Sequence, residues 1–571
     1  MNMVNLIIDN KKVTVEENTT ILKAAKKAGI KIPTLCYLEC QEVKGNCRLC
    51  VVEIKGRNKL VPSCATPVYE GMEVITTNKR LREIRKTILE LMLSNHPKDC
   101  LTCIKNGDCE LQTLAYEYNI RNIPFEHTNK WVPIDNNNPA IVRDPNKCIK
   151  CGRCIEACHK VQDMGIINFA FRSHDYTVTT AFNKTLDQTK CLLCGQCVLA
   201  CPVGALYEKE DSDRVWDAIY DDEKHVIVQT APAVRVALGE EFGLDKGTIV
   251  TNKMVAALKK LGFDKVFDTN FAADLTIMEE ANELIYRIKN DGVLPMMTSC
   301  CPGWINFVEK NAPDLIPNLS TCKSPHEMLG SITKTYYAKV FNVDPSKIFM
   351  VSVMPCTAKK YESAREELSN DLLKDVDAVL TTRELGRMLK ESGIDLKEIE
   401  SEEFDSPLGE STGAGNIFGS TGGVMEAALR TAYEAVTGKV LCELDFKAVR
   451  GMDGIKEASV KLNDVTLNIA VVNGIKNAKK LEEKINSNQC NYHFVEVMTC
   501  PGGCVNGGGQ PPIKNDNIKD RLNSLYEIDK NKTLRKSHEN PDIIKIYDEF
   551  LEEPLSHISH KLLHTKYINR K

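Results

Sequence analysis

The sequence predicts a multidomain chain of mixed α+β and α/β class, with small cysteine-rich domains first and a larger α/β domain after them. The 571 residues are enough for about three to four domains. Sixteen of the 24 cysteines precede residue 202, and the other eight lie between Cys300 and Cys504. From about residue 210, apolar strand-like runs alternate with helix-like runs, which is typical of a parallel sheet.

Composition and termini narrow the class of protein. The net charge is −4, whereas a general nucleic-acid binder is usually basic. Residues 1–12 lack the basic and apolar regions of a signal peptide. No run approaches the ~18 apolar residues of a membrane span. We therefore expect a soluble, cytoplasmic protein with no nucleic-acid or membrane partner, in which clustered cysteines indicate metal sites and not disulfides.

Residues 1–78 combine a predicted hairpin (4–15), a predicted helix (21–29) and a group of spaced cysteines. The spacing C-x10-C-x2-C-x13-C is wider than the C-x4-C-x2-C of plant-type ferredoxins. A zinc site is the alternative for four thiolates, and Cys40 competes for the first position. We expect a ferredoxin-like β-grasp domain with one 2Fe–2S cluster, held by Cys36, Cys47, Cys50 and Cys64.

Residues 79–126 begin with a predicted helix (79–94) that has apolar residues at helical spacing and a basic first half. One histidine and three cysteines follow in the pattern H-x3-C-x2-C-x5-C, namely His96, Cys100, Cys103 and Cys109. Zinc would suit these ligands equally well. Because iron–sulfur motifs flank the segment, we favour a 4Fe–4S cluster that extends an electron path.

Residues 127–209 carry the pattern C-x2-C-x2-C-x3-C twice, at 148–158 and at 191–201. In bacterial ferredoxins such a duplicated run holds two 4Fe–4S clusters, and the fourth cysteine of each run binds the other cluster. The predicted ligand sets are Cys148, Cys151, Cys154 and Cys201 for one cluster, and Cys158, Cys191, Cys194 and Cys197 for the other. One 2Fe–2S and three accessory 4Fe–4S clusters make an electron relay, so a catalytic site is expected downstream.

Residues 210–571 are expected to contain that site. Three of the predicted strands end in cysteine, at Cys301, Cys356 and Cys500, and Cys504 follows after a Gly pair. Ligands of open α/β sheets bind at the carboxyl ends of strands, so these cysteines are expected to converge. The glycines let backbone approach a bulky group. The four thiolates suffice for a further 4Fe–4S cluster.

Cys300 immediately precedes Cys301 in the segment TSCCPGW (298–304). Adjacent side chains of an extended strand point to opposite faces, so one thiol can bind a metal while its neighbour faces elsewhere. Burial of both thiols in the core is the alternative. A helix is predicted to follow Asp274. On this helix, Glu280, Glu283 and Arg287 share one face, a pattern that by itself also fits an exposed salt bridge.

Three segments resemble the signatures of the iron-only (FeFe) hydrogenases, namely TSCCPGW (298–304), MPCTAKKYE (354–362) and EVMTCPGGCVNGGGQP (496–511). With the cluster motifs before them, the whole chain is similar to the monomeric clostridial type. The resemblance implies reversible formation of H2 from two protons and two electrons at an H-cluster. That group is a 4Fe–4S unit bridged by one cysteine to a diiron site with CO, cyanide and a bridging dithiolate.

The resemblance also implies roles for individual residues. Cys301, Cys356, Cys500 and Cys504 would hold the 4Fe–4S unit, with Cys504 as the bridge. Lys359 would donate a hydrogen bond to a cyanide, and the pocket would be lined by Ala231, Pro232, Pro325, Met354, Phe418 and Met498. The proton relay of the family matches Cys300, Glu280, Ser320, Glu283 and Arg287. Ala233 replaces a common serine and His326 a common glutamine, so hydrogen bonding there is left open.

The expected partners are ferredoxin or flavodoxin as electron carrier, hydrogenase maturation proteins, H2 and protons, and the expected state is a monomer. The basic stretch 79–86 would meet an acidic carrier. The alternatives are an iron–sulfur subunit of an NADH-oxidising complex, a hydrogen sensor or cluster-assembly relative, and an electron-bifurcating subunit. The C-terminal cysteine motifs disfavour the first, and the intact TSCCPGW disfavours an assembly protein. No NADH or flavin motif supports the last.

Three other sequence features are explained without a catalytic role. The Gly-rich segment 413–423 lacks a P-loop lysine and is expected to let backbone pack near the pocket. Cys40, Cys322, Cys442 and Cys490 have no assigned role. The basic, histidine-containing tail 557–571 is expected to be a solvated terminus, with metal binding as the alternative.

Overall fold

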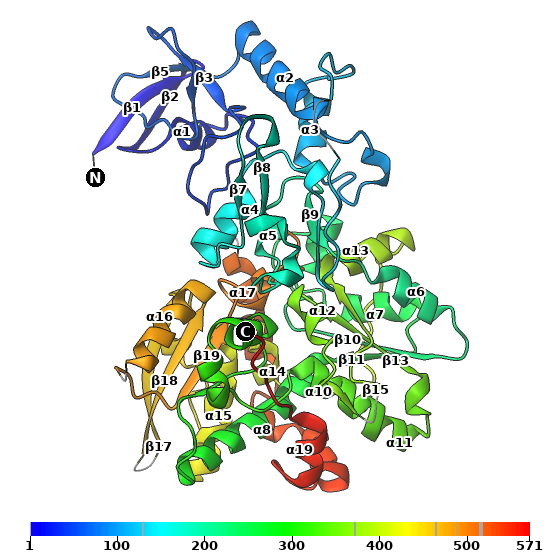
Figure 1. Cartoon of the computed structure of the whole chain (residues 1–571). Coiled ribbons are helices and arrows are strands. Elements are labelled where there is room, and N and C mark those ends of the chain that lie inside the picture. Colours follow the sequence, from blue (N-terminus) through cyan, green and yellow to red (C-terminus); the bar gives the residue numbers. More distant parts are fainter. Residues whose placement is uncertain (1, 128–130, 371–372, 463–464, 488, 513–517) are drawn as a thin grey trace.

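The computed structural model describes the chain except for residues 1, 128–130, 371–372, 463–464, 488 and 513–517. An N-terminal lobe lies at one end of the molecule, a large α/β domain at the other, and the duplicated cysteine runs between them (Figure 1). The predicted fold class is confirmed. Within the described residues, no helix has the length and apolar character needed to cross a membrane.

The N-terminal lobe is a β-grasp sheet that packs on one helix. Its strand order is β2-β1-β5-β3-β4, and the alternation of buried and exposed residues in β1 fits a sheet with one covered face. The side chain of Thr20 caps the helix by accepting from the backbone N–H of Lys23. The elements are β1 (Met3–Ile8), β2 (Lys11–Glu16), α1 (Ile21–Lys27), β3 (Val51–Ile54), β4 (Val61–Pro62) and β5 (Glu73–Ile75).

The middle region is built from short elements that leave much of the backbone to loops around the cysteines. Two helices come first, α2 (Lys79–Ser94) and α3 (Glu110–Glu117). The duplicated runs then each provide one short helix, α4 (Arg153–Glu156) and α5 (Gln196–Ala200). Two antiparallel pairs complete the region: β6 (Ile141–Arg143) with β9 (Leu206–Glu208), and β7 (Ile167–Ala170) with β8 (Thr177–Thr180).

The C-terminal domain contains two four-stranded sheets. The first is parallel throughout and has the order β11-β10-β13-β16, with β10 (His225–Thr230), β11 (Lys265–Asp268), β13 (Ile348–Met354) and β16 (Ala378–Thr381). The second has the order β12-β19-β18-β17, with β12 (Met296–Met297), β17 (Ile455–Leu462), β18 (Val465–Asn473) and β19 (Phe494–Met498). Only β17 is antiparallel to its neighbour in that sheet.

Helices pack on both sheets and also separate them. The first sheet is contacted by α6 (Ser212–Ile219), α7 (Thr251–Leu261) and α13 (Thr382–Glu391), and the second by α9 (Pro302–Asn311) and α16 (Ile475–Asn486). The long helix α8 (Thr269–Lys289) packs against α10 (Pro325–Ile332), α14 (Gly413–Ile417) and α15 (Gly423–Thr437). The remaining helices are α11 (Ala338–Phe341), α12 (Ala358–Glu362), α17 (Ile518–Asn531), α18 (Pro541–Ile546) and α19 (His557–Leu563), and β14 (Ser369–Asn370) pairs with β15 (Leu373–Lys374).

Three sequence predictions need correction. The helix expected after Asp274 begins at Thr269, because the side chain of Asp268 caps it by accepting from the N–H of Asn270. The strand expected to reach Cys301 ends at Met297, so both cysteines lie in the connection to α9. The tail is not a solvated terminus, since α19 is followed by the buried His564.

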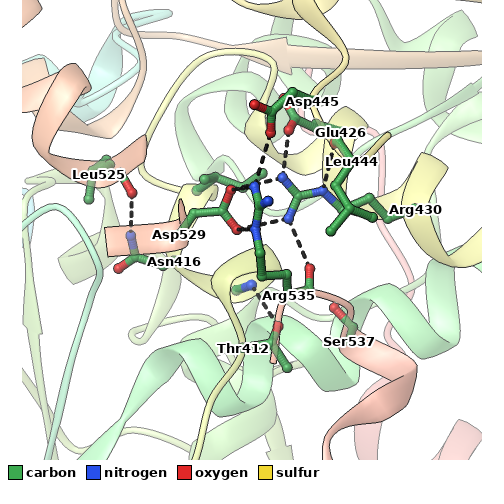
Figure 2. A network of polar contacts seen from close by, with 12 residues as sticks. Thr412, Asn416, Glu426, Arg430, Leu444, Asp445, Leu525, Asp529, Arg535 and Ser537 are labelled. Carbon is green, nitrogen blue, oxygen red and sulfur yellow. Dashed lines mark hydrogen bonds and ion pairs between the residues drawn. The ribbon is translucent and has the colours of Figure 1, made fainter. Parts of the chain in front are cut away.

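A buried ionic network joins α15 to α17 and to the segment after α17 (Figure 2). The Arg430 guanidinium donates to both oxygens of Asp529, at 2.9 Å each, and to Glu426 at 2.6 Å. Arg535 also donates to Asp529 at 2.6 Å. A Cβ atom on Gly413 would lie only 2.1 Å from Asp529 Oδ1, so the network also fixes the start of α14.

We expect Arg430→Ala to destabilise the protein strongly, because it removes the buried cation that bridges Asp529 and Glu426 and leaves them only Arg535 and Arg450 as partners. Loss of one partner of such a network costs about 3–5 kcal/mol, which scanning calorimetry of the full-length protein would detect as a lower Tm. Lys484→Ala is the matched control, because its pair with Glu457 is exposed and such pairs contribute only about 0–1 kcal/mol. Equal shifts for the two variants would contradict this account of the network.

Candidate metal centres and active site

The structure brings together the four cysteines predicted for the first site. All four are buried, and the Sγ atoms of Cys50 and Cys64 lie 3.3 Å apart. A hydrogen bond from Cys36 lowers the pKa of Cys47 to about 6, and one from Cys64 lowers the pKa of Cys50 to about 7. Thiolates are the metal-binding form. Cys40 is exposed, so the geometry favours Cys36 in the first position.

Of the second predicted site, the structure brings the three cysteines together, and His96 follows the end of α2. Burial lowers the pKa of His96, so the imidazole is held in its neutral, metal-binding form. Its Nδ1 atom is buried and has no hydrogen-bond partner among the described residues. Burial raises the pKa of Cys109, and the nearby Cys103 and Cys100 raise it further. An imidazole and three thiols with these properties fit a metal or a cluster.

The duplicated runs form two groups of thiols that exchange their fourth members. Burial raises the pKa of Cys154, and its charged neighbours include Cys148, Cys151 and Cys201. Burial likewise raises the pKa of Cys197, whose neighbours include Cys194, Cys191 and Cys158. These are the two sets that the spacing predicts. Tightly packed buried thiols with raised pKa values fit bound iron, which stabilises their thiolate forms.

The predicted ligand and lining residues of the C-terminal domain converge on one cavity between the two sheets. Strands β13 and β19 end at its wall, with Met354 and Met498, and α9 begins beside it. The cavity is lined by the five cysteines Cys300, Cys301, Cys356, Cys500 and Cys504, by Lys359, and by Ala231, Pro232, Pro325, Met354, Phe418 and Met498. Burial and neighbouring thiols raise the pKa of Cys500, as expected for a group built to meet a metal cation.

The last thiol group of the relay touches this cavity. Cys194 is among the charged neighbours of Cys500, and Thr357 Oγ1 donates to the carbonyl oxygen of Leu193 at 2.7 Å. A Cβ atom on Gly508 would lie 2.4 Å from the carbonyl oxygen of Cys194, so only glycine allows this approach. The geometry therefore places the relay in contact with the cavity.

Lys359 is held at the cavity by a buried ionic chain. Its Nζ atom donates to Glu362 Oε2 at 2.5 Å and to the carbonyl oxygen of Cys300 at 3.1 Å. Burial opposes the charge, but Glu362 outweighs it and raises the pKa of Lys359. Glu362 also contacts His326 Nε2 at 2.7 Å, and Glu327 lies 3.0 Å from the same nitrogen. His326 is thus part of the same series of ion pairs as Lys359. Its ring contacts two carboxylates at the position where the sequence left the hydrogen bonding open.

Helix α8 contributes the carboxyl groups of the predicted proton relay. Glu280 is buried, and neither of its oxygens has a hydrogen-bond partner among the described residues. Burial and the charge of Glu283 raise the pKa of Glu280 to about 8. Ser320 Oγ donates to Glu283 Oε2 at 2.9 Å, and Arg287 Nη2 donates to Glu283 Oε1 at 2.6 Å. The salt bridge between Glu283 and Arg287 is present, but the alternative of an exposed acidic face is wrong, because both carboxyls are buried.

Cys300 completes the set on the cavity side. It is buried, and burial followed by the charge of Glu280 raises its pKa well above the usual value. The thiol is therefore held in its protonated form in the protein alone. Cys301 differs, since its Sγ lies 3.3 Å from Thr499 Oγ1 and accepts from the backbone N–H of Thr499 at 3.4 Å. The two adjacent thiols have different partners, but both line the cavity, so the prediction that one of them faces elsewhere is wrong.

Several polar residues around the cavity were not predicted from the sequence. Glu362 lies at i+3 from Lys359 on α12, so the spacing of a helical ion pair was the available signal. Thr499 and His564 had no such signal, because their partners are distant in the chain, whereas Glu327 directly follows its partner His326. The Gly-rich segment 413–423 behaves as expected, since a Cβ on Gly415 would lie 2.4 Å from the carbonyl oxygen of Asn270.

Comparison with protein-family models matches most of the chain. Residues 224–508 match the iron-only hydrogenase large subunit, C-terminal domain, and residues 515–570 match the iron hydrogenase small subunit. Before them, residues 1–79 match a 2Fe–2S cluster-binding domain, residues 85–124 the NADH-ubiquinone oxidoreductase-G iron–sulfur binding region, and residues 147–205 a 4Fe–4S dicluster domain.

Individual relatives agree with these matches. The chain is 50% identical to an NADP-reducing hydrogenase subunit of Solidesulfovibrio fructosivorans, over 100% of both chains. It is 44% identical to iron hydrogenase 1 of Clostridium pasteurianum, over 99% of this chain and 100% of the relative. Among solved structures, an apo [FeFe]-hydrogenase variant from Chlamydomonas reinhardtii is 46% identical, with a TM-score of 0.57 over 62% of this chain and 98% of the other.

Proposed function

The chain belongs to the iron-only hydrogenase family, and from this premise we propose that it interconverts H2 with two protons and two electrons at the cavity between its sheets. The family and the N-terminal iron–sulfur domains place it in hydrogen metabolism with an electron relay. The observation that carries the specific proposal is the convergence of five thiols and Lys359 on one cavity.

The donor set fits the H-cluster. Cys301, Cys356, Cys500 and Cys504 would hold its 4Fe–4S unit, and Cys504 would bridge to the diiron site. When bound, the group supplies the redox-active metals at which H2 is formed or split. Lys359 would orient it as a fixed cationic donor, because two of the three donors of its ammonium are already engaged by Glu362 and Cys300. The apolar lining formed by residues such as Met354, Phe418 and Met498 would exclude water.

Proton delivery follows from the states of the buried acids. With a pKa of about 8, Glu280 is mostly protonated at neutral pH and is able to return a proton to Cys300 after the thiol has given up its own. Glu283 would reprotonate it by way of Ser320, whose hydroxyl accepts one proton while it donates another. Arg287 would keep Glu283 oriented through its two hydrogen bonds. Protons would thus reach the cavity through Cys300.

Electrons would enter through the accessory clusters. We assign one 2Fe–2S cluster to the first cysteine group, and 4Fe–4S clusters to the His96 group and to the two exchanged groups. The corresponding domains are 1–78, 79–126 and 127–209, ahead of the catalytic domain 210–571. The approach of Cys194 to Cys500 supports transfer from the last cluster to the cavity.

Reduced ferredoxin or flavodoxin is the proposed electron donor to a monomeric cytoplasmic enzyme, whose diiron site is inserted by maturation proteins. Lys79, Arg80 and Arg82 are exposed at the start of α2 and would meet an acidic carrier. Arg85 is excluded from that surface, which corrects the sequence prediction. It is buried and donates to the carbonyl oxygen of Val51 at 2.6 Å.

A second candidate is a subunit of a hydrogenase complex linked to a pyridine nucleotide. The full-length similarity to an NADP-reducing hydrogenase subunit favours it. In that case electrons would be exchanged with a partner subunit instead of a free carrier. The reaction at the cavity would be the same for both candidates.

We expect Cys300→Ala to retain its iron and lose H2 evolution by at least about 10²-fold, the usual contribution of a proton donor. Cys301→Ala should instead disturb the cluster and lower the iron content. Both variants would be produced anaerobically with maturation proteins and assayed with a reduced dye, alongside Cys442→Ala, whose thiol is exposed. Near-normal turnover of Cys300→Ala would contradict its role. An inactive wild-type protein with complete iron would contradict the enzyme itself.

The docking surface makes a separate prediction. Charge reversal in the double variant Lys79→Glu, Arg82→Glu should slow ferredoxin-linked turnover about tenfold at low salt, and the difference should shrink as salt rises. Dye-linked turnover serves as the control and should not change. Unchanged ferredoxin kinetics would contradict docking at this surface and favour the subunit candidate.

A further inference from the structure

The imidazole of His564 lies between helix α8 and the segment before α10, which together carry residues of the proposed proton relay. Its Nδ1 lies 2.8 Å from Thr321 Oγ1, and its Nε2 lies 3.0 Å from Glu279 Oε2 on α8. The residue is buried, directly after α19. A histidine bonded through both ring nitrogens is able to accept a proton at one and release a proton from the other.

His564 lies beside Glu283, the carboxylate at the outer end of the proposed relay. A ring nitrogen of His564, a carboxylate oxygen of Glu283 and the Sγ of Cys322 all lie within 4.8 Å of one another. The backbone N–H of Thr321 donates to Glu283 at 3.1 Å. One hydroxyl or one water molecule therefore suffices to connect the carboxyl to the ring.

On its other side, His564 adjoins a residue that reaches solvent. The rings of His564 and His560 have centroids 4.2 Å apart, and His560 is exposed. The charged neighbour of Glu283 on the opposite side is Arg287, whose guanidinium is always protonated and so does not release a proton. Between these two neighbours, only the histidine is able to exchange protons.

We propose that His564 and His560 form a proton-exchange branch that connects Glu283 to solvent through the C-terminal segment. The inference rests on the proposed hydrogenase function. For outward transfer, protonated Glu283 gives its proton to a ring nitrogen of His564, through Thr321 Oγ1 or a water. The resulting imidazolium then releases a proton to His560 or to water beside it. Inward transfer is the reverse, and no other reactant is consumed.

The charges around the branch suit such transfer. Glu279 and Glu283 face His564 from α8, Cys322 and Thr321 from the segment before α10, and His560 from α19. Burial opposes ionisation of Glu279, but hydrogen bonds from His564, Ser559 and Tyr547 outweigh it and lower its pKa, so a carboxylate is present to stabilise the imidazolium.

The outer histidine is set to release protons. Burial and the charges of His564 and His557 lower the pKa of His560, while Glu279 and Glu283 oppose that shift. A group with a lowered pKa gives its proton to water readily, which suits the solvent end of the branch.

The test uses the holoenzyme and the variant His564→Gln, whose amide retains hydrogen-bonding groups for Thr321 and Glu279 but does not carry a proton. The matched control is His538→Gln, because His538 is likewise bonded to a threonine and a glutamate, Thr431 at 3.1 Å and Glu434 at 3.0 Å, away from the relay. Dye-linked H2 evolution is measured from pH 6 to 9, with iron content and Tm recorded for each protein.

We expect His564→Gln to lower turnover about threefold or more and to change the pH profile of turnover, while His538→Gln leaves both unchanged. His560→Ala should lower turnover less and regain it when imidazole is added, but not when the weakly basic pyrazole is added. Equal turnover and pH profiles for His564→Gln and His538→Gln would overturn the branch, as would the absence of imidazole rescue. An inactive wild-type holoenzyme would instead overturn the proposed function.

Discussion

The burial of Glu280 is the constraint on which the rest of the active region depends. A carboxyl group is costly to bury in its charged form, and the nearby Ser320 hydroxyl and Ser299 N–H lower the pKa of Glu280 too little to offset that cost. The protein resolves this by raising its pKa to about 8, so that the neutral acid predominates. The two neighbouring carboxylates on α8 differ from Glu280, because Glu279 and Glu283 each accept several hydrogen bonds. One helix thus presents an acid beside two carboxylates.

The two sheets and the relay are arranged around the same point. Parallel strands from both sheets direct their carboxyl ends to the cavity, which is how cysteines more than a hundred residues apart come together. Glycines allow the last cysteine group of the relay to approach the C-terminal domain closely, because a side chain at Gly508 would clash with the carbonyl oxygen of Cys194. The ionic network around Arg430 holds α15 and α17 against α14, which leads into the cavity residue Phe418. The proposed electron path and the proposed proton path lie on different elements.

Much of this was predictable because the motifs are local. The ligand spacings of the duplicated runs determine which thiols meet, and the two exchanged groups are found as predicted. Strands such as β10 and β13 are rich in apolar residues and buried along nearly their whole length, which is typical of parallel sheets. The residues that line the cavity were predicted from the family resemblance, and all six of them line one cavity in the structure.

What the sequence did not reveal are contacts between distant segments. His564 meets Glu279 across 285 positions of the chain, and no local pattern marks such a pair. Arg85 looked available for docking because its helix is basic, yet tertiary packing buries it against β3. The hydrogen bonding of His326 was left open by the sequence, and in the structure two carboxylates contact its ring. In each case, the charge of a residue was readable and its partner was not.

The central claim is that Glu280 is a neutral acid at physiological pH. Infrared difference spectroscopy of the full-length protein against Glu280→Gln tests this directly, because the variant removes only the carboxyl absorption of that residue. The account predicts a protonated-carboxyl band at pH 7 that disappears with a midpoint at about pH 8. A band already absent at pH 7, with a midpoint near the ordinary glutamate value of about 4.3, would contradict it.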